Sequence, residues 1–363
     1  MHRMHTRPRM LRDMALACLV LLTACVADYY AYPTWARVGG QSLNKGENGL
    51  WLRYTWYFGR HDEQQTRRMA DDLSRRQIRY AYFHVRYIQA DGTLRYRHPD
   101  HAQSLVRILH ERAPGVKAIA WVYAGNRRGQ GNVELADPRV RRRMVAAAQW
   151  LVNDCGFDGV QWDYEVCPDG DESFISLLEQ TRAALPAGKL LGAAVPMRMP
   201  WPMRRWGWSE PYFARVAQSC DQMAVMCYDS GQMLPRAYVR LVRQQAIRIT
   251  RAVDQAGSPC RVLLGLPTYE KGPVSHNPRA ENIRLALKGV REGLQAKHAQ
   301  PAVFAGVAIF ADYTTDATEW HTYDRAWLQG GSGARQLDGL AARRSSAHHK
   351  QWRASGSDVV QRR

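Results

Sequence analysis

The sequence predicts an α/β protein, a (β/α)8 barrel that forms a single domain. Eight short apolar runs alternate with longer amphipathic stretches between residues 49 and 329. Such alternation is typical of a parallel sheet whose strands are connected by helices, and eight repeats favour closure of that sheet into a barrel. The chain has 363 residues, of which 45% are hydrophobic, so it is long enough to form one large domain.

The strands are predicted from runs of apolar and aromatic residues. In chain order they span residues 50–58, 79–88, 117–125, 158–165, 190–197, 221–229, 261–269 and 304–313. A helix-like stretch follows each strand, and two of these stretches, 239–253 and 283–294, carry apolar stripes with the helical period of 3.6 residues. An open doubly wound sheet is the alternative. Such sheets usually have a glycine-rich turn after the first strand, and residues 58–65 (FGRHDEQQ) contain none.

Residues 1–24 are predicted to be a secretory signal. Four arginines precede the apolar run 14–24, which ends in small residues and which by itself is too short to span a bilayer. Leu22-Thr23-Ala24-Cys25 resembles the lipobox of bacterial lipoproteins, and this resemblance implies cleavage before Cys25 and attachment of lipid to its thiol. The protein is therefore expected in the cell envelope, held at the periplasmic or outer membrane by lipid. A simple cleavable signal, with Cys25 incidental, is the alternative.

A linker (residues 25–48) and a flexible basic tail (residues 330–363) are expected on either side of the barrel (residues 49–329). The tail has few large apolar residues and many Gly, Ser and Arg, so it cannot bury enough surface to order itself. The formal net charge is +18, but the basic residues are spread over helices and the tail without a recognised nucleic-acid fold. We expect a solvated basic surface that faces anionic envelope polymers, and no nucleic-acid partner.

The cysteines of the predicted barrel have no metal-site spacing. They are Cys155, Cys167, Cys220, Cys227 and Cys260, with no Cys-x-x-Cys pair among them, so no zinc site and no other metal is expected. Cys220 and Cys260 directly precede two neighbouring strands, whose starts lie within disulfide reach. An exported protein can oxidise such a pair. A disulfide between Cys220 and Cys260 is therefore predicted, and a buried free thiol is the alternative.

The fourth predicted strand carries a row of polar side chains. Side chains alternate along a strand, so Gln161, Asp163 and Glu165 point the same way, toward the barrel axis. Two carboxyl groups this close cannot both ionise freely, and the pKa of one should rise. A carboxylic acid that stays protonated near neutral pH is what cleavage of a glycosidic bond needs. An ion-paired cluster that only closes the end of the barrel is the alternative.

The segment 158–165 (DGVQWDYE) resembles the D-G-x-D-x-D-x-E signature of the family 18 glycoside hydrolases, which include the chitinases. Four further segments resemble strands of that family in the correct order, over most of residues 49–325. These are 193–196 (AAVP), 221–229 (DQMAVMCYD, with Met226, Tyr228 and Asp229), 262–269 (VLLGLPTY, ending at Tyr269) and 306–316 (GVAIFADYTTD). A single D-x-D-x-E would be a weak signal, whereas five motifs in register are a strong one.

The resemblance implies a retaining, substrate-assisted mechanism without a metal or an organic cofactor. Glu165 would be the general acid and base, and the 2-acetamido group of an N-acetylglucosamine at the cleavage subsite would attack the anomeric carbon. Asp163 would orient that group and stabilise its developing charge, and Tyr228 would hydrogen-bond its carbonyl. Asp229 would hold the sugar. Substrate contacts are also implied for Gln161, Met226, Tyr269 and Phe310.

Two positions depart from the family pattern. Gln161 replaces the middle Asp of the signature, and its amide is expected to hydrogen-bond Asp163 without raising the pKa of that residue by repulsion. An altered pH dependence is therefore predicted. Phe310 stands where the family usually has Trp, so the apolar floor under the sugar should offer less stacking area. The stretch after the seventh strand is short and has no large insertion, which implies a shallow, open cleft.

Three tryptophans follow the fifth predicted strand, and two other functions stay open. Trp201, Trp206 and Trp208 are expected to form a glycan platform or, alternatively, to pack over their own loop. A non-hydrolytic carbohydrate-binding envelope lipoprotein is the second functional hypothesis, and a structural envelope protein is the third. Relatives without turnover usually lose the acid, so the presence of Glu165 favours an enzyme of chitinase-like or endo-N-acetylglucosaminidase-like type. The sequence leaves the glycan and the oligomeric state open, with a monomer expected.

Overall fold

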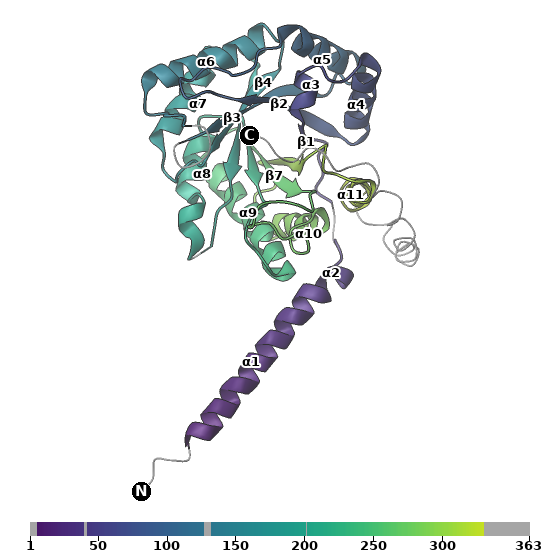
Figure 1. Ribbon diagram of the computed structural model, residues 1–363, viewed down its shortest axis with the longest axis vertical. Coiled ribbons are helices and arrows are strands. Elements are labelled where there is room, and N and C mark those ends of the chain that lie inside the picture. Colours follow the sequence, from purple (N-terminus) through teal and green to yellow (C-terminus); the bar gives the residue numbers. More distant parts are fainter. Residues whose placement is uncertain (1–5, 40–41, 127–131, 201, 330–363) are drawn as a thin grey trace.

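The eight predicted strands form one closed barrel. The computed structural model describes residues 6–39, 42–126, 132–200 and 202–329. Within them the strands are parallel, each pairs with its neighbours in chain order, and β1 closes the ring against β8 (Figure 1). The predicted tail (residues 330–363) and Trp201 lie outside the described residues. The (β/α)8 barrel is confirmed, and the open sheet is excluded.

The strands are shorter than predicted at several of their carboxyl ends. They are β1 (Asn48–Leu52), β2 (Ile78–Tyr87), β3 (Lys117–Gly125), β4 (Gly159–Glu165), β5 (Leu190–Pro196), β6 (Gln222–Met226), β7 (Arg261–Pro267) and β8 (Phe304–Phe310). The aromatic run after β1 was predicted to be strand, but it forms a short helix, α3 (Tyr54–Tyr57), in which Tyr57 is buried. The last residues of the sixth, seventh and eighth predicted strands, 227–229, 268–269 and 311–313, belong to the loops that follow β6, β7 and β8.

A ring of helices surrounds the barrel (Figure 1). These are α4 (Glu63–Arg75), α5 (Pro99–Arg112), α6 (Pro138–Asn153), α7 (Glu172–Ala184), α8 (Glu210–Ala217), α9 (Pro235–Gln255), α10 (Ile283–Leu294) and α11 (Ala317–Tyr323), with short η1 (Met203–Trp206) and η2 (Asp324–Leu328). The apolar stripes of α9 and α10 are buried as predicted. Side chains of Asp62, Asp171, Asn282 and Asp316 cap the first turns of α4, α7, α10 and α11. These caps supply acceptors for backbone N–H groups that the helix leaves unpaired.

The inside of the barrel is filled by large aromatic rings from β1, β2 and β3, which pack against small residues from other strands. Trp51, Tyr82 and Trp121 come from β1, β2 and β3, and they pack against small residues such as Ala224 and Ala308. This packing fills the barrel below the ends of the strands. The side chains that close β4, β6 and β8 therefore stand on an apolar floor.

A long helix precedes the barrel. Helix α1 (Thr6–Tyr30) contains the segment Met10–Tyr30, whose 21 residues are long and apolar enough to cross a membrane. The predicted apolar run 14–24 is part of this longer helix, which continues to Tyr30. A signal sequence near the N-terminus passes the same test. Cleavage before Cys25, its lipidation and the predicted linker stay predictions.

Candidate active site

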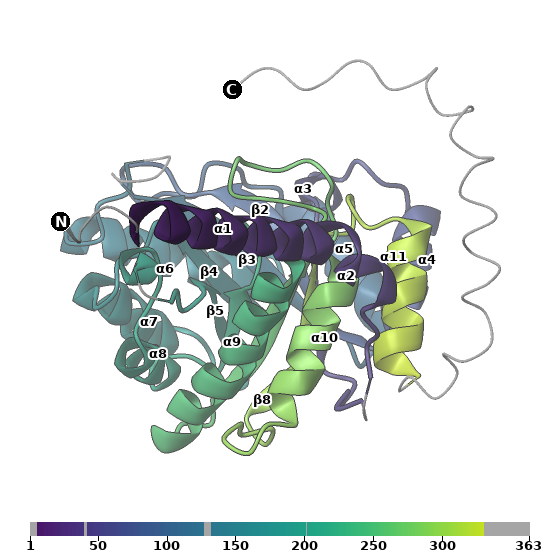
Figure 2. The ribbon, with the colours of Figure 1, turned by 90° about the horizontal axis from the view of Figure 1, so that it is seen from below.

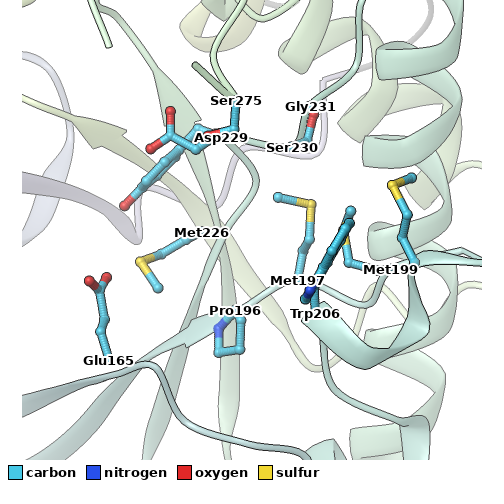
Figure 3. A pocket seen from close by; sticks show the side chains of 12 residues that line it. Glu165, Pro196, Met197, Met199, Trp206, Met226, Asp229, Ser230, Gly231 and Ser275 are labelled. Atoms are coloured by element: carbon cyan, nitrogen blue, oxygen red, sulfur yellow. The ribbon is translucent and has the colours of Figure 1, made fainter. Parts of the chain in front are cut away.

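A cleft of about 400 Å³ opens at the carboxyl ends of the strands. Glu165 from β4, Pro196 from β5 and Met226 from β6 line it, and so does Asp229 in the loop after β6. Figure 3 shows Met226 between Glu165 and Asp229. This is the end of a (β/α)8 barrel at which the loops after the strands gather polar groups. The cleft therefore contains residues that the sequence placed at the ends of separate strands.

Asp163 and Glu165 form a pair of carboxyl groups with raised pKa values. Asp163 is only 4% exposed, and its Oδ2 accepts a hydrogen bond of 2.8 Å from Nε1 of Trp121. Burial, and then the negative charge of Glu165, raise the pKa of Asp163 well above its usual range. Burial, and then repulsion from Asp229, raise the pKa of Glu165. Oδ1 of Asp163 has no hydrogen-bond partner among the described residues.

Gln161 lies below this pair and does not bond to it. Its Oε1 accepts a hydrogen bond of 2.9 Å from Nε1 of Trp51, and its Nε2 has no partner among the described residues. The expected hydrogen bond between Gln161 and Asp163 is therefore wrong. The reason is that the two side chains bind different indoles: Gln161 accepts from the N–H of Trp51, and Asp163 accepts from the N–H of Trp121.

Tyr228 and Phe310 form an apolar wall beside the carboxyl pair. Their rings stack with centroids 4.9 Å apart, and Phe310 also contacts Trp51 at 5.7 Å and Trp121 at 6.1 Å between centroids. Tyr228 is 8% exposed and lines the cleft. Burial raises the pKa of its hydroxyl well above the usual range, so the group stays protonated and can donate a hydrogen bond.

Asp229 is held at the cleft by Tyr269. The Tyr269 hydroxyl donates a hydrogen bond of 2.6 Å to Oδ1 of Asp229, whose side chain is 35% exposed. Burial raises the pKa of Asp229, and the bond from Tyr269 partly opposes that rise. Tyr269 was predicted to contact substrate, but in the structure it is not part of the cleft lining and reaches the site through Asp229.

Two buried residues behind Asp229 were missed by the sequence analysis. Nδ1 of His276 lies 3.6 Å from Oδ1 of Asp229 and 3.3 Å from Oε2 of Glu281, and the side chains of His276 and Glu281 are fully buried. Nε2 of His276 donates a hydrogen bond of 2.8 Å to the carbonyl oxygen of Tyr269. The backbone N–H and the hydroxyl of Ser230 donate to Glu281. The sequence signal is only a His and a Glu five residues apart in a loop.

The same three side chains are the described residues that could hold a metal ion. Asp229, His276 and Glu281 each offer a ligand atom, and these atoms lie within 4.8 Å of one another. All three atoms already take part in the contacts with Tyr269, Ser230 and one another. The arrangement is therefore a hydrogen-bonded support for Asp229.

The family of the chain is shown by comparison with known proteins. Residues 53–329 match the model of the glycosyl hydrolases family 18. The chain belongs to this family. A GH18 chitinase from Cycas revoluta shares the fold at 15% identity, with a TM-score of 0.54, over 77% of this chain and 99% of the chitinase. The Bacillus cereus spore cortex-lytic enzyme SleL shares it at 12% identity, with a TM-score of 0.51, over 77% and 74% of the two chains. No curated protein sequence matches.

The tryptophans in the loop after β5 fall into two groups, one at the cleft and one packed within the loop. In this family 18 protein, Trp206 is exposed and lines the cleft. Trp208 is buried, and its Nε1 donates a hydrogen bond of 3.0 Å to the carbonyl oxygen of Cys167. Three methionines, Met197, Met199 and Met203, line the cleft beside Trp206. This half of the cleft is therefore apolar and adaptable in shape.

A second cavity, of about 640 Å³, lies beside α8, and its two carboxylates are Asp169 and Glu210. Oδ1 of Asp169 accepts hydrogen bonds from the backbone N–H and the hydroxyl of Ser209. Glu210 forms ion pairs with Arg198, Arg248 and Arg251. Burial opposes these contacts, but the hydrogen bonds from Arg251 and Arg248 outweigh it and lower the pKa of Glu210. Glu210 is therefore ionised at neutral pH and cannot act as a proton donor.

The two predicted disulfide partners are neighbours. The sulfur atoms of Cys220 and Cys260 lie 3.9 Å apart, and both residues are buried thiols in the structure. They stand before β6 and β7, at the end of the barrel opposite the cleft. A disulfide between them stays a prediction.

Proposed function

We propose that the protein is a glycosidase that cleaves glycans with N-acetylglucosamine at the cleavage subsite, and that Glu165 is its general acid and base. The observation that carries this proposal is the carboxyl pair at the cleft. Glu165 lies at the cleft with a raised pKa, and the buried Asp163 beside it also has a raised pKa. An acid whose pKa is raised toward neutral pH can give a proton to a leaving oxygen.

The proposed reaction is retaining and substrate-assisted, as the family resemblance implies. Glu165 gives its proton to the glycosidic oxygen while the bond from that oxygen to the anomeric carbon breaks. The carbonyl oxygen of the substrate's 2-acetamido group forms the new bond to that carbon, so no side chain acts as nucleophile. Glu165 then takes a proton from water, which opens the cyclic intermediate. No metal and no organic cofactor takes part in this scheme.

The neighbouring side chains have positions that suit their proposed roles. Asp163 lies directly behind Glu165, where its carboxylate would orient the acetamido group and oppose the positive charge that develops on it. Tyr228 lines the cleft, and its hydroxyl would donate to the acetamido carbonyl. Phe310 would form the apolar floor under the sugar, and Asp229, held by Tyr269, would bind a sugar hydroxyl.

The substrate class is supported by the names of the structural neighbours. The Cycas revoluta chitinase is described in complexes with (GlcNAc)4 and (GlcNAc)3, and SleL as a spore cortex-lytic enzyme. We extend to this chain only the N-acetylglucosamine unit. The loop 268–282 after β7 contains no helix or strand, so no inserted subdomain stands beside the cleft. An open cleft of this kind suits short or branched glycans better than a crystalline polymer.

We also propose export and attachment to the cell envelope through the N-terminal segment. The apolar helix α1 and the lipobox-like residues that end at Cys25 support this location. The order of segments proposed is signal, linker, barrel and tail, as predicted from the sequence. Because the linker begins at Cys25, lipid on this residue would hold the barrel close to the membrane.

Glu165→Gln tests the proposed function. The amide keeps the size of the side chain but carries no transferable proton, so turnover should fall by roughly 10²–10⁴-fold while glycan binding survives. Glu179→Gln, an exposed position on α7, is the matched control and should keep wild-type turnover. The substrates are chitin oligomers, peptidoglycan, N-glycans and exopolysaccharide, with product analysis. Wild-type turnover in Glu165→Gln would disprove the assignment.

A thiazoline analogue of N-acetylglucosamine tests the mechanism separately. It mimics the cyclised intermediate and should inhibit competitively. If the compound fails while Glu165 stays essential, a mechanism with a protein nucleophile on the same barrel is the better explanation. Binding of a glycan without turnover of any of the four substrates would favour the non-hydrolytic carbohydrate-binding protein.

A further inference from the structure

The large apolar side chains that the barrel exposes lie on one face. Outside α1 and α2 (Tyr32–Trp35), the described residues expose five of them, to between 46% and 105% of full exposure. They are Val166, Trp206, Met233, Val274 and Tyr313, in the loops after β4, β5, β6, β7 and β8 respectively. We call these five residues the apolar rim. All five lie at the end of the barrel that carries the cleft, and Trp206 lines the cleft itself. The opposite face of the described barrel has no counterpart.

The chemistry of the rim suits hydrocarbon better than sugar. Single exposed apolar residues are common on soluble proteins, but here their distribution is confined to the loops of one face. Aromatic rings stack on sugars, whereas Val166, Met233 and Val274 have no ring to do so. Aliphatic side chains insert among acyl chains, and Trp and Tyr prefer the boundary between hydrocarbon and water. Trp206 and Tyr313 are the residues of that second type.

The N-terminal segment joins the barrel at this same face. Nε of Arg236, in the first turn of α9, lies 3.1 Å from Oδ1 of Asp28, and the backbone N–H of Arg236 also donates to Asp28. Arg279, in the loop before α10, donates a hydrogen bond of 2.7 Å to the carbonyl oxygen of Tyr29. Helices α9 and α10 begin where the loops after β6 and β7 end. Figure 1 shows α1 pointing away from the barrel, so that only its C-terminal end, next to α2, lies near α9 and α10 (seen from below in Figure 2).

The chain then runs from the rim to the other end of the barrel. Lys288 of α10 donates to the carbonyl oxygen of Arg37, and Lys45 donates to the carbonyl oxygen of Pro301 just before the start of β8. An anchor before Asp28 is therefore tethered at the rim, whether it is the helix α1 or lipid on Cys25. The point at which the anchor is attached and the apolar rim therefore lie at the same end of the barrel.

The charge around the rim is positive in the loops after β5 and β7 and negative in the loops after β4 and β8, where Asp169 and Asp316 are exposed. Arg204, Arg205, Lys271 and Arg279 are exposed in the loops that carry Trp206 and Val274, and the acidic neighbour Glu270 is exposed among them. The Arg205 guanidinium lies 4.8 Å from the centre of the Trp206 ring. Cations next to exposed apolar side chains are attracted to anionic lipid headgroups. The exposed cations and the exposed apolar side chains of these two loops therefore both favour a bilayer that contains anionic lipids.

We propose that the apolar rim docks on a lipid bilayer that contains anionic lipids, so that the cleft opens toward the membrane. Substrates would then be glycans held at the membrane surface. The inference rests on the proposed N-terminal anchoring and is independent of the proposed hydrolytic chemistry. Docking would remove the five rim side chains from water, and it would orient a barrel that a single tether would otherwise leave free to rotate.

Hydrogen exchange of the full chain in lipid nanodiscs tests the docking. The variant Met233→Ser/Val274→Ser removes two rim side chains that do not line the cleft, and Ala187→Ser, exposed on the opposite face, is the control. In nanodiscs with phosphatidylglycerol, rim loops 229–234 and 268–282 of the double variant should exchange about tenfold faster than in the wild type. In neutral detergent the two proteins should exchange equally. Loops 113–116 and 186–189, at the opposite face, should not differ.

The outcomes separate the alternatives. Equal exchange of the wild type and the double variant in nanodiscs would overturn the docking. If the rim of the wild type is protected equally in purely zwitterionic nanodiscs and in nanodiscs with phosphatidylglycerol, the role of anionic lipid is overturned. Protection of the rim by soluble N-acetylglucosamine oligomers, with none from nanodiscs, would assign the rim to glycan binding. Failure of the chain to enter nanodiscs would refute the anchoring and the docking together, whereas loss of turnover alone would affect only the proposed function.

Discussion

Replacing Asp163 by asparagine should stabilise the protein while it abolishes turnover. Asp163 is buried, and one of its carboxylate oxygens, Oδ1, has no hydrogen-bond partner among the described residues. Ionisation of Asp163 therefore leaves a buried acceptor unpaired. The substitution Asp163→Asn puts a neutral amide at this position, which keeps an oxygen for the Trp121 N–H and offers an N–H to Glu165.

The size and the pH dependence of the gain follow from the raised pKa of Asp163. An unsatisfied buried polar group costs about 1–3 kcal/mol, and 1 kcal/mol shifts the Tm of a domain of this size by about 2–4 °C, so Tm should rise by roughly 2–12 °C. At acid pH, below the usual range of an Asp, the carboxyl is protonated in both the folded and the unfolded chain, and the gain is absent. As pH rises, the unfolded chain loses its proton first, the wild type loses stability, and the gain grows until Asp163 ionises in the folded protein.

Thermal unfolding of wild type and variant between pH 4 and pH 8 measures this gain. Asp158→Asn, just before the same strand, is the control, and its change in stability should have the opposite sign. Oδ2 of Asp158 accepts from the backbone N–H of Ala118 and contacts Nε2 of His110 at 2.8 Å, so this carboxylate is well paired. That variant should be less stable than the wild type. The reasoning is refuted if Asp163→Asn is no more stable than the wild type at pH 8, or if its gain is as large at pH 4.

Three further predictions concern the cleft and the anchor. Asp229→Asn removes a negative charge that raises the pKa of Glu165, so the alkaline limb of kcat/KM should move to lower pH; an unmoved limb in a full pH profile would contradict this. His276→Gln should lower kcat/KM by about tenfold, which is the equivalent of about 1.4 kcal/mol for a lost buried hydrogen bond. Steady-state kinetics at fixed pH measure this change, and exposed His298→Gln is the control. If His276→Gln and the wild type have equal kcat/KM, the support of Asp229 is dispensable. Cys25→Ala should leave the protein unprocessed or release it into the soluble fraction, as fractionation and intact mass would report; a correctly processed variant that remains on the membrane would exclude the lipid anchor.

The fold and the central carboxyl row could be predicted from the sequence because both depend on local periodicity. Alternation of strand and helix over eight repeats determines a closed parallel barrel, and the two-residue period of a strand places Gln161, Asp163 and Glu165 on one face. Strand order also places Met226 and Asp229 beside Glu165, since carboxyl ends of parallel strands meet at one end of a barrel. Each of these inferences needs only the local pattern of each strand and the order of the strands in the chain.

Contacts between distant residues were decided only by the tertiary structure. Gln161 bonds Trp51 rather than Asp163, because the indoles of β1 and β3 occupy the interior below the carboxyl pair. His276 supports Asp229 from a loop with no periodicity of its own, so nothing in the local pattern indicated its position. The apolar rim likewise collects single residues from five separate loops. Its members are neighbours only because barrel closure brings the carboxyl ends of all eight strands to the same face.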